Sequence, residues 1–294
     1  MTVPICLIGR KNGSLGSKHD LDDIIGRFVS YFKGQNPDKK FYTDQETFNH
    51  FLSESVAESH TDEFLRNNAK VVITFGGDGT MVNAAKRFPG IPILGVNLGK
   101  LGFITDIPVS HGAMGIYRIA RDVINSNFDS YVTEKRTMIN LTIGNSLALN
   151  EIAIRSTGSI IEFEVRVDGE LAYQCRGDGL IVSTPTGSTA YALSAGGSII
   201  HPTSKVLELV PMVPQTLSCR PLIVNDSSKI DVKIISGEAM VLADGQIVLN
   251  STKHVMIELD KKTSTFVHPK SRELNYSYFG MLREKLNWQH LPTA

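Results

Sequence analysis

Residues 76–80 combine a glycine-rich turn with a single carboxylate. The turn follows the apolar run 71–75, precedes residues of helical composition, and reads Gly76, Gly77, Asp78, Gly79, Thr80. Between a strand and a helix, such glycines let backbone N–H groups approach phosphate oxygens closely. A carboxylate at that place repels phosphate unless it holds a divalent metal or accepts a proton from a nucleophile. Asp78 is therefore a candidate general base; the alternative is a tight turn in which Asp78 only caps the helix.

Two common phosphate-binding motifs are excluded by counting. The dinucleotide fingerprint requires a third glycine three positions after Gly79, where Val82 stands. Residues 95–101 are similar to a P-loop, but the stretch is one residue too short and has Leu101 in place of serine or threonine. The segments at 76–80 and 95–101 therefore match neither motif.

Length and charge limit the class of protein. The chain has 294 residues, enough for two cores, and its 41% hydrophobic content is typical of globular domains. Lys and Arg total 30, as do Asp and Glu, so the formal net charge is zero. Proteins that bind nucleic acid by counterion release need a basic excess. We therefore expect no nucleic-acid partner.

The cysteine pattern predicts reduced thiols. Cys6, Cys175 and Cys219 are widely spaced and include no C-x-x-C motif, which is typical of cytosolic proteins. The eight histidines show no spacing typical of metal ligands, so no structural zinc is expected. No apolar run approaches the ~20 residues of a membrane span, and the N-terminal apolar stretch is too brief for a signal sequence. We expect a cytoplasmic protein with no membrane partner.

Alternating strands and helices predict a parallel sheet in the first third of the chain. Apolar runs typical of buried strands lie at 3–8, 71–75 and 92–96, and a weaker one lies at 40–43. Residues 20–33 and 47–58 have helical spacing. This order predicts an α/β domain with a parallel sheet, whose ligands bind beyond the carboxyl ends of the strands, where residues 76–80 lie.

Beyond residue 130 the hydrophobic period changes to two. Residues 161–167 alternate strictly, as a half-buried strand does. Similar short runs occur at 137–143, 179–183, 229–235, 239–243 and 254–259. Asp168-Gly169 and Asp244-Gly245 are typical hairpin turns. We predict a mostly β C-terminal domain with one helix at 187–195, and a tail helix at 276–287 that returns to the first domain.

The expected domains are 1–125 with 271–294, which carry the glycine-rich turn, and 126–270, which is β-rich. The alternating strands of the β-rich domain leave sheet edges that a second sheet or a neighbouring subunit must protect. We expect a homo-oligomer formed mainly through residues 130–270; a monomer whose sheets close on themselves is the alternative.

A second polar cluster occupies residues 176–197. A strand leads there into a Thr-Gly-Ser-Thr turn that opens a helix. The hydroxyls of Thr186, Ser188 and Thr189 are natural N-cap and ligand-binding groups. Tyr191 offers a flat face on which an adenine or nicotinamide ring stacks.

Upstream, Asn150 and Glu151 place an amide beside a carboxylate at the end of a β-rich segment. A carboxylate accepts hydrogen bonds from two vicinal ribose hydroxyls, while an amide reads a base edge. As a lone dipeptide, Asn-Glu is also compatible with an ordinary turn.

Together these segments resemble the NAD kinase family. The family is marked by GGDGT on a strand–helix turn, an Asn-Glu pair, a DGL-x-x-x-TPTGSTAY segment and a late Asp-Gly turn. These features occur here in that order at 76–80, 150–151, 178–191 and 244–246, and 97–103 are similar to the family's interdomain loop. GGDGT is shared with diacylglycerol, sphingosine and phosphofructokinase relatives, whereas TPTGSTAY with Asn-Glu is specific to the NAD kinases. The resemblance covers nearly the whole chain.

The resemblance implies the two-domain fold described above, ATP with Mg²⁺, and a homodimer or homotetramer with the adenosine site close to the interface. By position, Asp78 and Gly79 would meet the reacting hydroxyl and the donor phosphates, and the turn residues Gly76, Gly77 and Thr80 would bind phosphate. Asn150 and Glu151 would contact adenosine. The dinucleotide site would be lined by Arg176, Asp178, Thr189, Ala190, Tyr191, Ser194 and Gln246.

The leading hypothesis is transfer of a phosphoryl group from ATP to the 2′-hydroxyl of the adenosine ribose of NAD, which gives NADP. A ribose hydroxyl is a poor nucleophile at neutral pH, so a base must take its proton, and Asp78 fits that role. One alternative is a lipid or sphingoid kinase that shares GGDGT; another is a dinucleotide sensor that catalyses nothing. The sequence leaves open ATP against polyphosphate as donor, NADH as an acceptor, and feedback by reduced cofactors.

Overall fold

The computed structural model describes residues 5–9, 18–35, 38, 40–51, 57–98, 102–105, 107–108, 131–269 and 277–288. The chain divides into an N-terminal unit, Met1–Glu134 with Ser264–Ala294, and a β-rich unit, Lys135–Thr263. The expected divisions lie at 125/126 and 270/271. The chain passes between the units within two long strands, β7 (Tyr131–Leu141) and β18 (His254–Pro269).

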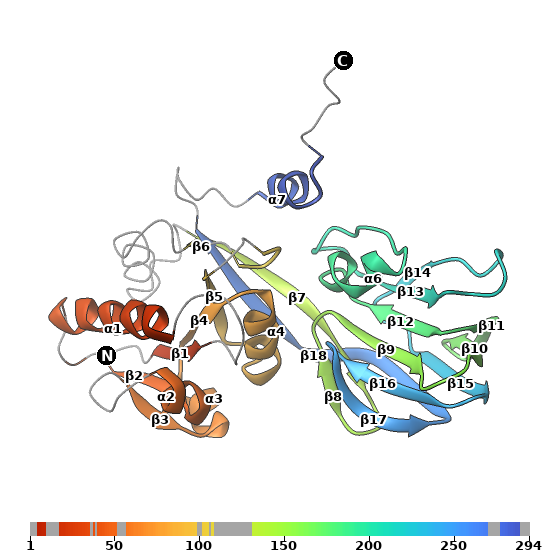
Figure 1. The fold of residues 1–294 in the computed structure, drawn as a ribbon, viewed down its shortest axis with the longest axis horizontal. Coiled ribbons are helices and arrows are strands. Elements are labelled where there is room, and N and C mark those ends of the chain that lie inside the picture. The colour runs from red at the N-terminus through yellow and green to blue at the C-terminus, as the bar shows by residue number, and fades with distance from the viewer. Residues whose placement is uncertain are drawn as a thin grey trace, which may run out of the picture. The chain divides into compact units, whose positions relative to one another are not determined.

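A parallel sheet forms the centre of the N-terminal unit (Figure 1). Its strands, in the spatial order β5-β4-β1-β2-β3, are β5 (Pro92–Asn97), β4 (Val71–Gly76), β1 (Ile5–Gly9), β2 (Phe41–Asp44) and β3 (Glu58–His60). Every residue of β1, β2 and β4 is buried, because helices and strands cover both faces of a parallel sheet. Beside β5, Thr265 and Phe266 of β18 continue the sheet in parallel, as does β6 (Ile107–Pro108). The predicted α/β domain with buried parallel strands is confirmed.

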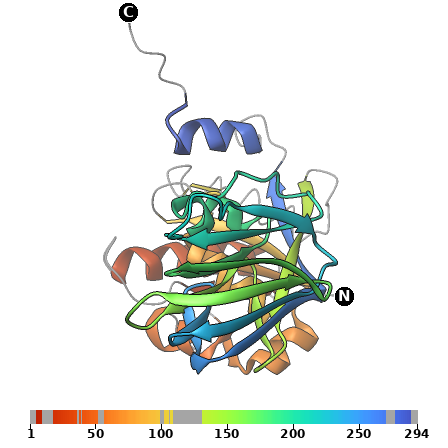
Figure 2. The same ribbon diagram turned by 90° about the vertical axis from the view of Figure 1, so that its right-hand side faces the viewer.

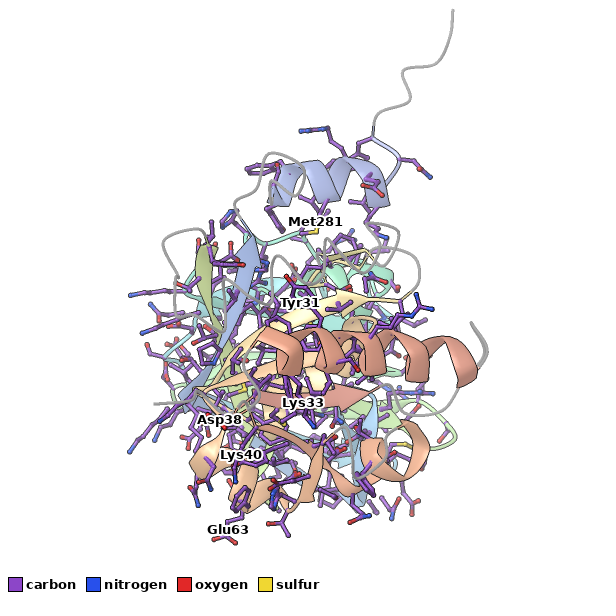
Figure 3. The ribbon with its side chains drawn as sticks, turned by 90° about the vertical axis from the view of Figure 1, so that its left-hand side faces the viewer. Tyr31, Lys33, Asp38, Lys40, Glu63 and Met281 are labelled. Carbon is purple, nitrogen blue, oxygen red and sulfur yellow. The ribbon has the colours of Figure 1, made fainter. Side chains whose placement is uncertain are left out.

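Helix α1 (Lys18–Gln35) packs on this sheet through an aromatic cluster, and Figure 3 looks onto this helix. The Phe28 ring lies 5.6 Å from Phe75 of β4 and 6.3 Å from Phe41 of β2, measured between centroids. Phe32, one turn further along the helix, lies 4.9 Å from Phe28. Residues four apart share one helix face, so α1 presents this aromatic pair to the core.

The chain after β2 differs from the predicted single helix over 47–58. The helix α2 is Gln45–Phe51, residue 57 is irregular, residues 58–60 form β3, and residues 52–56 lie outside the described part of the chain. Helix α3 (Asp62–Asn68) follows, and the hydroxyl of its N-cap Thr61 accepts the Phe64 N–H at 3.3 Å. Both β3 and α3 are too short to show a hydrophobic period, so packing decides their conformation.

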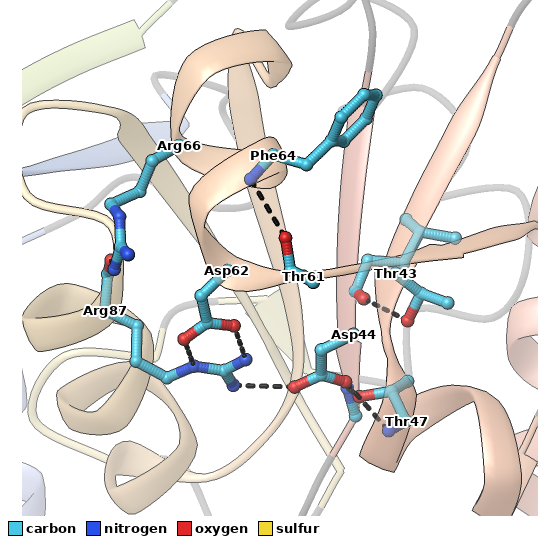
Figure 4. Close-up of polar contacts among 10 residues, drawn as sticks. Thr43, Asp44, Thr47, Thr61, Asp62, Phe64, Arg66 and Arg87 are labelled. Carbon is cyan, nitrogen blue, oxygen red and sulfur yellow. Dashed lines mark hydrogen bonds and ion pairs between the residues drawn. The ribbon is translucent and has the colours of Figure 1, made fainter.

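A charged cluster holds the end of helix α4 (Asp78–Arg87), which begins within the glycine-rich turn (Figure 4). The Arg87 guanidinium binds Asp62 of α3 through Nε at 2.9 Å and through Nη2, and it binds Asp44 of β2 through Nη1 at 2.6 Å. Arg66 donates to the Arg87 carbonyl oxygen at 3.2 Å. Burial lowers the pKa of Arg87, but the two carboxylates outweigh burial and raise that pKa, so the guanidinium stays charged. The cluster therefore fixes the last turn of α4 against β2 and α3.

The β-rich unit consists of antiparallel strands (Figures 1 and 2). One set of strands runs in the order β14-β13-β12-β9-β16-β17, and another runs in the order β11-β10-β15-β18. Inward-facing side chains of both sets share one hydrophobic core, in which Phe163, Val182 and Ile257 are fully buried. The strands not yet located are β8 (Ser146–Ala148), β9 (Glu151–Ser156), β10 (Ile161–Val167), β11 (Glu170–Gly177), β12 (Gly179–Ser183), β13 (Val206–Met212), β14 (Leu222–Asn225), β15 (Ile230–Ser236), β16 (Ala239–Ala243) and β17 (Gln246–Thr252). The predicted mostly-β domain is confirmed.

Both predicted Asp-Gly turns close two-residue hairpins. Asp168 and Gly169 have φ values of 52° and 87° between β10 and β11, and Asp244 and Gly245 have 47° and 76° between β16 and β17. Positive φ at both central residues defines the type I′ turn, which fits the right-handed twist of the strands.

The tail helix α7 (Tyr278–Lys285) belongs to the N-terminal unit, as predicted, and its Met281 and Leu282 are buried. The Ser277 hydroxyl caps it by accepting the Gly280 N–H at 3.1 Å. Among the described residues, we find no helix with the length and apolar character needed to cross a membrane.

Candidate active site

The glycine-rich turn joins β4 to α4. Strand β4 ends at Gly76, Gly77 is the N-cap in an extended conformation, and α4 begins at Asp78. The Gly77 carbonyl oxygen accepts the Thr80 N–H at 3.0 Å, which closes the first helical turn. A Cβ on Gly76 would lie 2.1 Å from Thr80 Oγ1, so only glycine fits that position. Gly79 is exposed, and a ligand can reach its backbone N–H.

The Asp78 carboxylate does not cap α4, and that alternative interpretation is wrong. It reaches instead to the loop 102–105, where Oδ2 accepts the Phe103 N–H at 2.7 Å. Oδ1 accepts the Ile104 N–H at 3.3 Å and the Thr105 hydroxyl at 2.9 Å. A Cβ on Gly102 would lie 1.7 Å from Oδ1, so the loop approaches this closely only with glycine there. The carboxylate is half-buried and held in one orientation.

Thr105 is itself held from β5. Its Oγ1 accepts a hydrogen bond from Asn97 Nδ2 at 2.8 Å, and both residues are buried. The loop is thus tied to the sheet on one side and to Asp78 on the other. An ionised carboxylate fixed in this way at a helix N-terminus, where the helix dipole favours negative charge, accepts a proton from a hydroxyl placed within about 2.6–3.2 Å.

In the β-rich unit, the Asp244 carboxylate plays the same structural part. Its Oδ2 accepts the Leu149 N–H at 2.9 Å, and its Oδ1 accepts the N–H groups of Asn150 and Glu151 at 2.7 and 3.2 Å. The sequence predicts that Asn150 and Glu151 end a β segment. In the structure they instead lead into β9, which starts at Glu151. The sequence identifies Asp244 only as a turn residue, because no pattern connects it to positions some 95 residues earlier.

The Thr-Pro-Thr-Gly segment after β12 lies directly against Asn150. The Thr184 N–H donates to the Asn150 carbonyl oxygen at 2.9 Å, and the Thr184 hydroxyl donates to the Leu149 carbonyl oxygen at 2.5 Å. Glu151 on β9 pairs with Ser183 on β12. Two motifs separated in the sequence are therefore neighbours at one end of β12.

The predicted single helix over 187–195 is in fact two short turns. Residues Gly187–Thr189 form a 3₁₀ turn and Tyr191–Ser194 an α-helical turn. Ala190 separates them with φ −107° and ψ −126°, which no helix contains. The Ser188 hydroxyl is buried, donates to the Pro185 carbonyl oxygen at 2.7 Å and accepts the Ile200 N–H at 3.0 Å. It supports the chain and is not available to a ligand.

The remaining predicted site residues fall into two places. Ser194 and Tyr191 lie beyond the end of β12 that Thr184 follows, and both residues are exposed, Tyr191 to 39%. Thr189 and Ala190, in the same segment, are half-buried. Gln246 is exposed at the start of β17, two residues after Asp244. Arg176 and Asp178 are exposed before the other end of β12. A five-residue strand spans about 17 Å, so the structure does not bring Arg176 and Asp178 to the Asn150 cluster within one chain.

A buried acid supports the segment after the second turn. Glu208 of β13 is fully buried, and its Oε1 accepts the Ser198 N–H at 2.7 Å. In the described part of the chain its Oε2 has no hydrogen-bond partner. Burial raises the pKa of Glu208, and the hydrogen bond from Ser198 opposes this rise only in part.

Comparison with known proteins assigns the family. The model of the ATP-NAD kinase N-terminal domain matches residues 29–125, and that of the ATP-NAD kinase C-terminal domain matches residues 149–267. A NAD kinase from Thiobacillus denitrificans is 40% identical over 238 residues, which cover 76% of this chain and 78% of the relative. A NAD kinase from Laribacter hongkongensis is 40% identical over 232 residues, or 74% and 76% of the two chains. The chain belongs to the NAD kinase family.

Solved structures agree with this assignment at the level of the fold. A yeast NADH kinase complexed with NADH has a TM-score of 0.82 at 20% identity and covers 99% of this chain and 89% of its own. A NAD kinase from Archaeoglobus fulgidus in complex with ATP has a TM-score of 0.70 at 24% identity, with 97% and 99% covered. The NAD kinase fold, with an α/β part and a β-rich part, is therefore that of this chain.

Substitution of Glu208 tests the effect of its burial on stability. Glu208→Gln keeps an acceptor for the Ser198 N–H and removes the ionisable group. Because the pKa of Glu208 is raised in the folded state, the folded chain retains a proton that the unfolded chain releases. The free energy of unfolding of the natural chain therefore falls as pH rises from about 4.3, the ordinary glutamate pKa, through the raised pKa. The variant escapes this fall, so its Tm should match the natural chain in acid and exceed it at neutral pH.

Thermal unfolding across this pH range measures the difference. Glu170→Gln, at an exposed position on β11, serves as the control and should follow the natural chain at every pH. A Glu208→Gln advantage that is largest in acid would contradict the direction of the pKa shift.

Proposed function

We propose that this chain transfers the γ-phosphoryl group of ATP to the 2′-hydroxyl of the adenosine ribose of NAD and so produces NADP. The observation that carries the proposal is the fixed Asp78 carboxylate on the turn that opens α4, in a chain that belongs to the NAD kinase family. Phosphoryl transfer needs mainly positioning and charge stabilisation. The chemical step is limited by its nucleophile, because a neutral hydroxyl attacks phosphorus poorly unless a base removes its proton.

In this proposal Asp78 is the general base. It accepts the proton of the 2′-hydroxyl as the hydroxyl oxygen attacks the γ-phosphorus and ADP leaves. The hydrogen bonds from Phe103 and Thr105 support the role, because they orient the carboxylate before substrate binds. The exposed Gly79 and its neighbour Gly77 would offer backbone N–H groups at the positive end of α4 to the donor phosphates. Gly76 is buried and the Thr80 N–H donates to the Gly77 carbonyl oxygen, so these two residues would shape the turn and not bind phosphate through their N–H groups.

We expect Mg²⁺ to enter with ATP as the substrate MgATP. Among the described residues there is no group of three acidic, histidine or cysteine side chains that could hold a metal ion. Both oxygens of Asp78 already accept hydrogen bonds from the loop. A protein-built magnesium site does not fit these residues, whereas Mg²⁺ commonly binds substrate phosphates with few protein ligands. The ion would neutralise charge on those phosphates.

The β-rich unit would hold the dinucleotide. Glu151 would accept hydrogen bonds from ribose hydroxyls, Asn150 would read the adenine edge, and the exposed face of Tyr191 would stack on a ring. Thr189, Ala190, Ser194 and Gln246 would complete the wall of the site. Fixed backbone at 149–151 supports this assignment, because Asp244 and Thr184 hold that segment from two sides.

We further propose a homo-oligomer, a dimer or tetramer, in the cytoplasm. Arg176 and Asp178 lie at the far end of β12 from Asn150, so they would serve the dinucleotide site of a neighbouring copy. The exposed, apolar side chains of Val213 and Leu217, close to Arg176 in the fold, are suited to such an interface. Three free thiols agree with a reducing compartment. Light scattering of active protein measures the assembly.

The assay for the reaction uses purified protein with MgATP and either NAD or diacylglycerol. We expect NADP from NAD and no phosphorylated lipid. Asp78→Asn should lower kcat by about 10²–10⁴-fold while NAD binding, measured by calorimetry, is kept. Lipid phosphorylation, or tight NAD binding without product under every divalent metal tried, would replace this proposal with a lipid kinase or a sensor. Assays with polyphosphate in place of ATP identify the phosphoryl donor, and assays with NADH in place of NAD identify the range of acceptors.

The two Asp-Gly hairpins provide a matched pair for the dinucleotide site. Asp244→Asn replaces one acceptor oxygen with an NH₂ group, so part of the N–H set of 149–151 loses its acceptor. The KM for NAD should rise about 5- to 100-fold, because a lost buried polar contact costs about 1–3 kcal/mol. The KM for ATP should change little. Asp168→Asn is the control, since Asp168 has nearly the same φ and its carboxylate accepts the Lys229 N–H at 2.8 Å, outside the segment 149–151. Equal effects of the two substitutions, or a change confined to ATP, would contradict the assignment.

A further inference from the structure

Two of the three cysteines meet in the β-rich unit. Cys175 lies on β11, and Cys219 lies in the segment between β13 and β14. Both side chains pack in the same hydrophobic core. Cys219 Sγ also lies 3.8 Å from the Gln174 carbonyl oxygen, and Cys175 Sγ lies 3.8 Å from that of Arg176. Both sulfurs therefore lie beside the same short stretch of β11, although 44 positions separate the two residues in the sequence.

Backbone hydrogen bonds hold the segment 213–219 along β11. At its start, the Asp178 N–H donates to the Met212 carbonyl oxygen at 2.9 Å, and the Gln215 N–H donates to that of Arg176 at 2.8 Å. At its end, the Cys219 N–H closes a turn on Thr216. The backbone therefore holds the start of this segment beside β11, and the contact of Cys219 Sγ with the Gln174 carbonyl oxygen places its end there as well.

The two thiols differ in access. Cys175 is 5% exposed, whereas Cys219 is partly exposed at the edge of the same hydrophobic core. Burial raises the pKa of the Cys175 thiol to about 12, and the neighbouring Cys219 thiol adds to the rise. An oxidant in solution therefore meets Cys219 first, and Cys175 is the second sulfur to react. Cys6, fully buried in β1 of the other unit, has neither exposure nor a neighbouring cysteine.

We propose that Cys175 and Cys219 are a modification site that a low-molecular-weight peroxide converts into an intrachain disulfide. Peroxide oxidises the Cys219 thiol to a sulfenic acid and leaves as water. The Cys175 sulfur then bonds to the Cys219 sulfur and displaces a second water. In balance, two thiols and one hydrogen peroxide give one disulfide and two waters, and a small thiol reverses the reaction. The disulfide would hold segment 213–219 on β11 next to Arg176. An effect of the disulfide on NAD binding through Arg176 is expected only if the proposed function is correct.

The test uses the full-length protein, hydrogen peroxide as the probe, and mass spectrometry after alkylation under denaturing conditions. We expect oxidised chains to lose two hydrogens in mass and to lose alkylation at Cys175 and Cys219 together. Cys6 should remain alkylated in the same chains, and dithiothreitol should restore both other sites. Since the readout is covalent mass, it stands whether or not the chain phosphorylates NAD.

Variants separate the proposed pair from general oxidation. Cys6→Ser should form the disulfide as the natural chain does. Cys175→Ser should leave Cys219 as a sulfenic or sulfinic acid, without a disulfide. The proposal is overturned if Cys219 in the natural chain oxidises to sulfinic acid while Cys175 stays alkylated, or if the product is a cross-link between two chains.

Discussion

An aspartate carboxylate that gathers hydrogen bonds from a remote segment organises the candidate site in each unit. Asp78 binds residues 103–105, and Asp244 binds residues 149–151. Hydrogen bonds to an ionised acceptor are stronger than neutral ones and fix geometry more tightly. Neither segment lies within a helix or a sheet along its whole length, so its backbone N–H groups need such an acceptor. The site residues are therefore placed by two side chains and not by the strand ladders alone.

The rest of the fold keeps these two carboxylates in position. In the N-terminal unit, buried parallel strands place the turn after β4, and the Arg87 cluster anchors the far end of α4. In the β-rich unit, pairing of β16 with β9 brings the Asp244 turn beside Asn150, and pairing of β9 with β12 adds Thr184. The chemistry assigned to Asp78 depends on orientation, because an acid–base group acts only within hydrogen-bond reach.

Much of the architecture follows from local patterns. Continuous apolar runs such as 71–75 predict strands buried on both faces, strict alternation at 161–167 predicts a half-buried strand, and Asp-Gly pairs predict the two hairpins. Short elements such as α3 have no period to detect. The break at Ala190 depends on contacts of Ser188 with Ile200, which local propensity does not encode. The same limit applies to the site. Motifs identify Asp78 and Asn150. The N–H groups that bind the Asp78 and Asp244 carboxylates lie 25 to 95 positions away from them, and strand pairing sets these contacts.

The central claim is that the orientation of Asp78, held by the close approach of loop 102–105, determines the rate of phosphoryl transfer. Gly102→Ala tests it most directly, because the added Cβ would collide with Asp78 Oδ1 and turn the carboxylate away without changing any charged group. Gly34→Ala in α1, where a Cβ meets no atom within 4 Å, is the control for stability. With both variants folded and NAD affinity unchanged, kcat of Gly102→Ala should fall about 10²-fold, as expected for a misplaced reacting group, while Gly34→Ala keeps the natural rate. A natural kcat for Gly102→Ala would contradict a role for the fixed Asp78 carboxylate in the reaction.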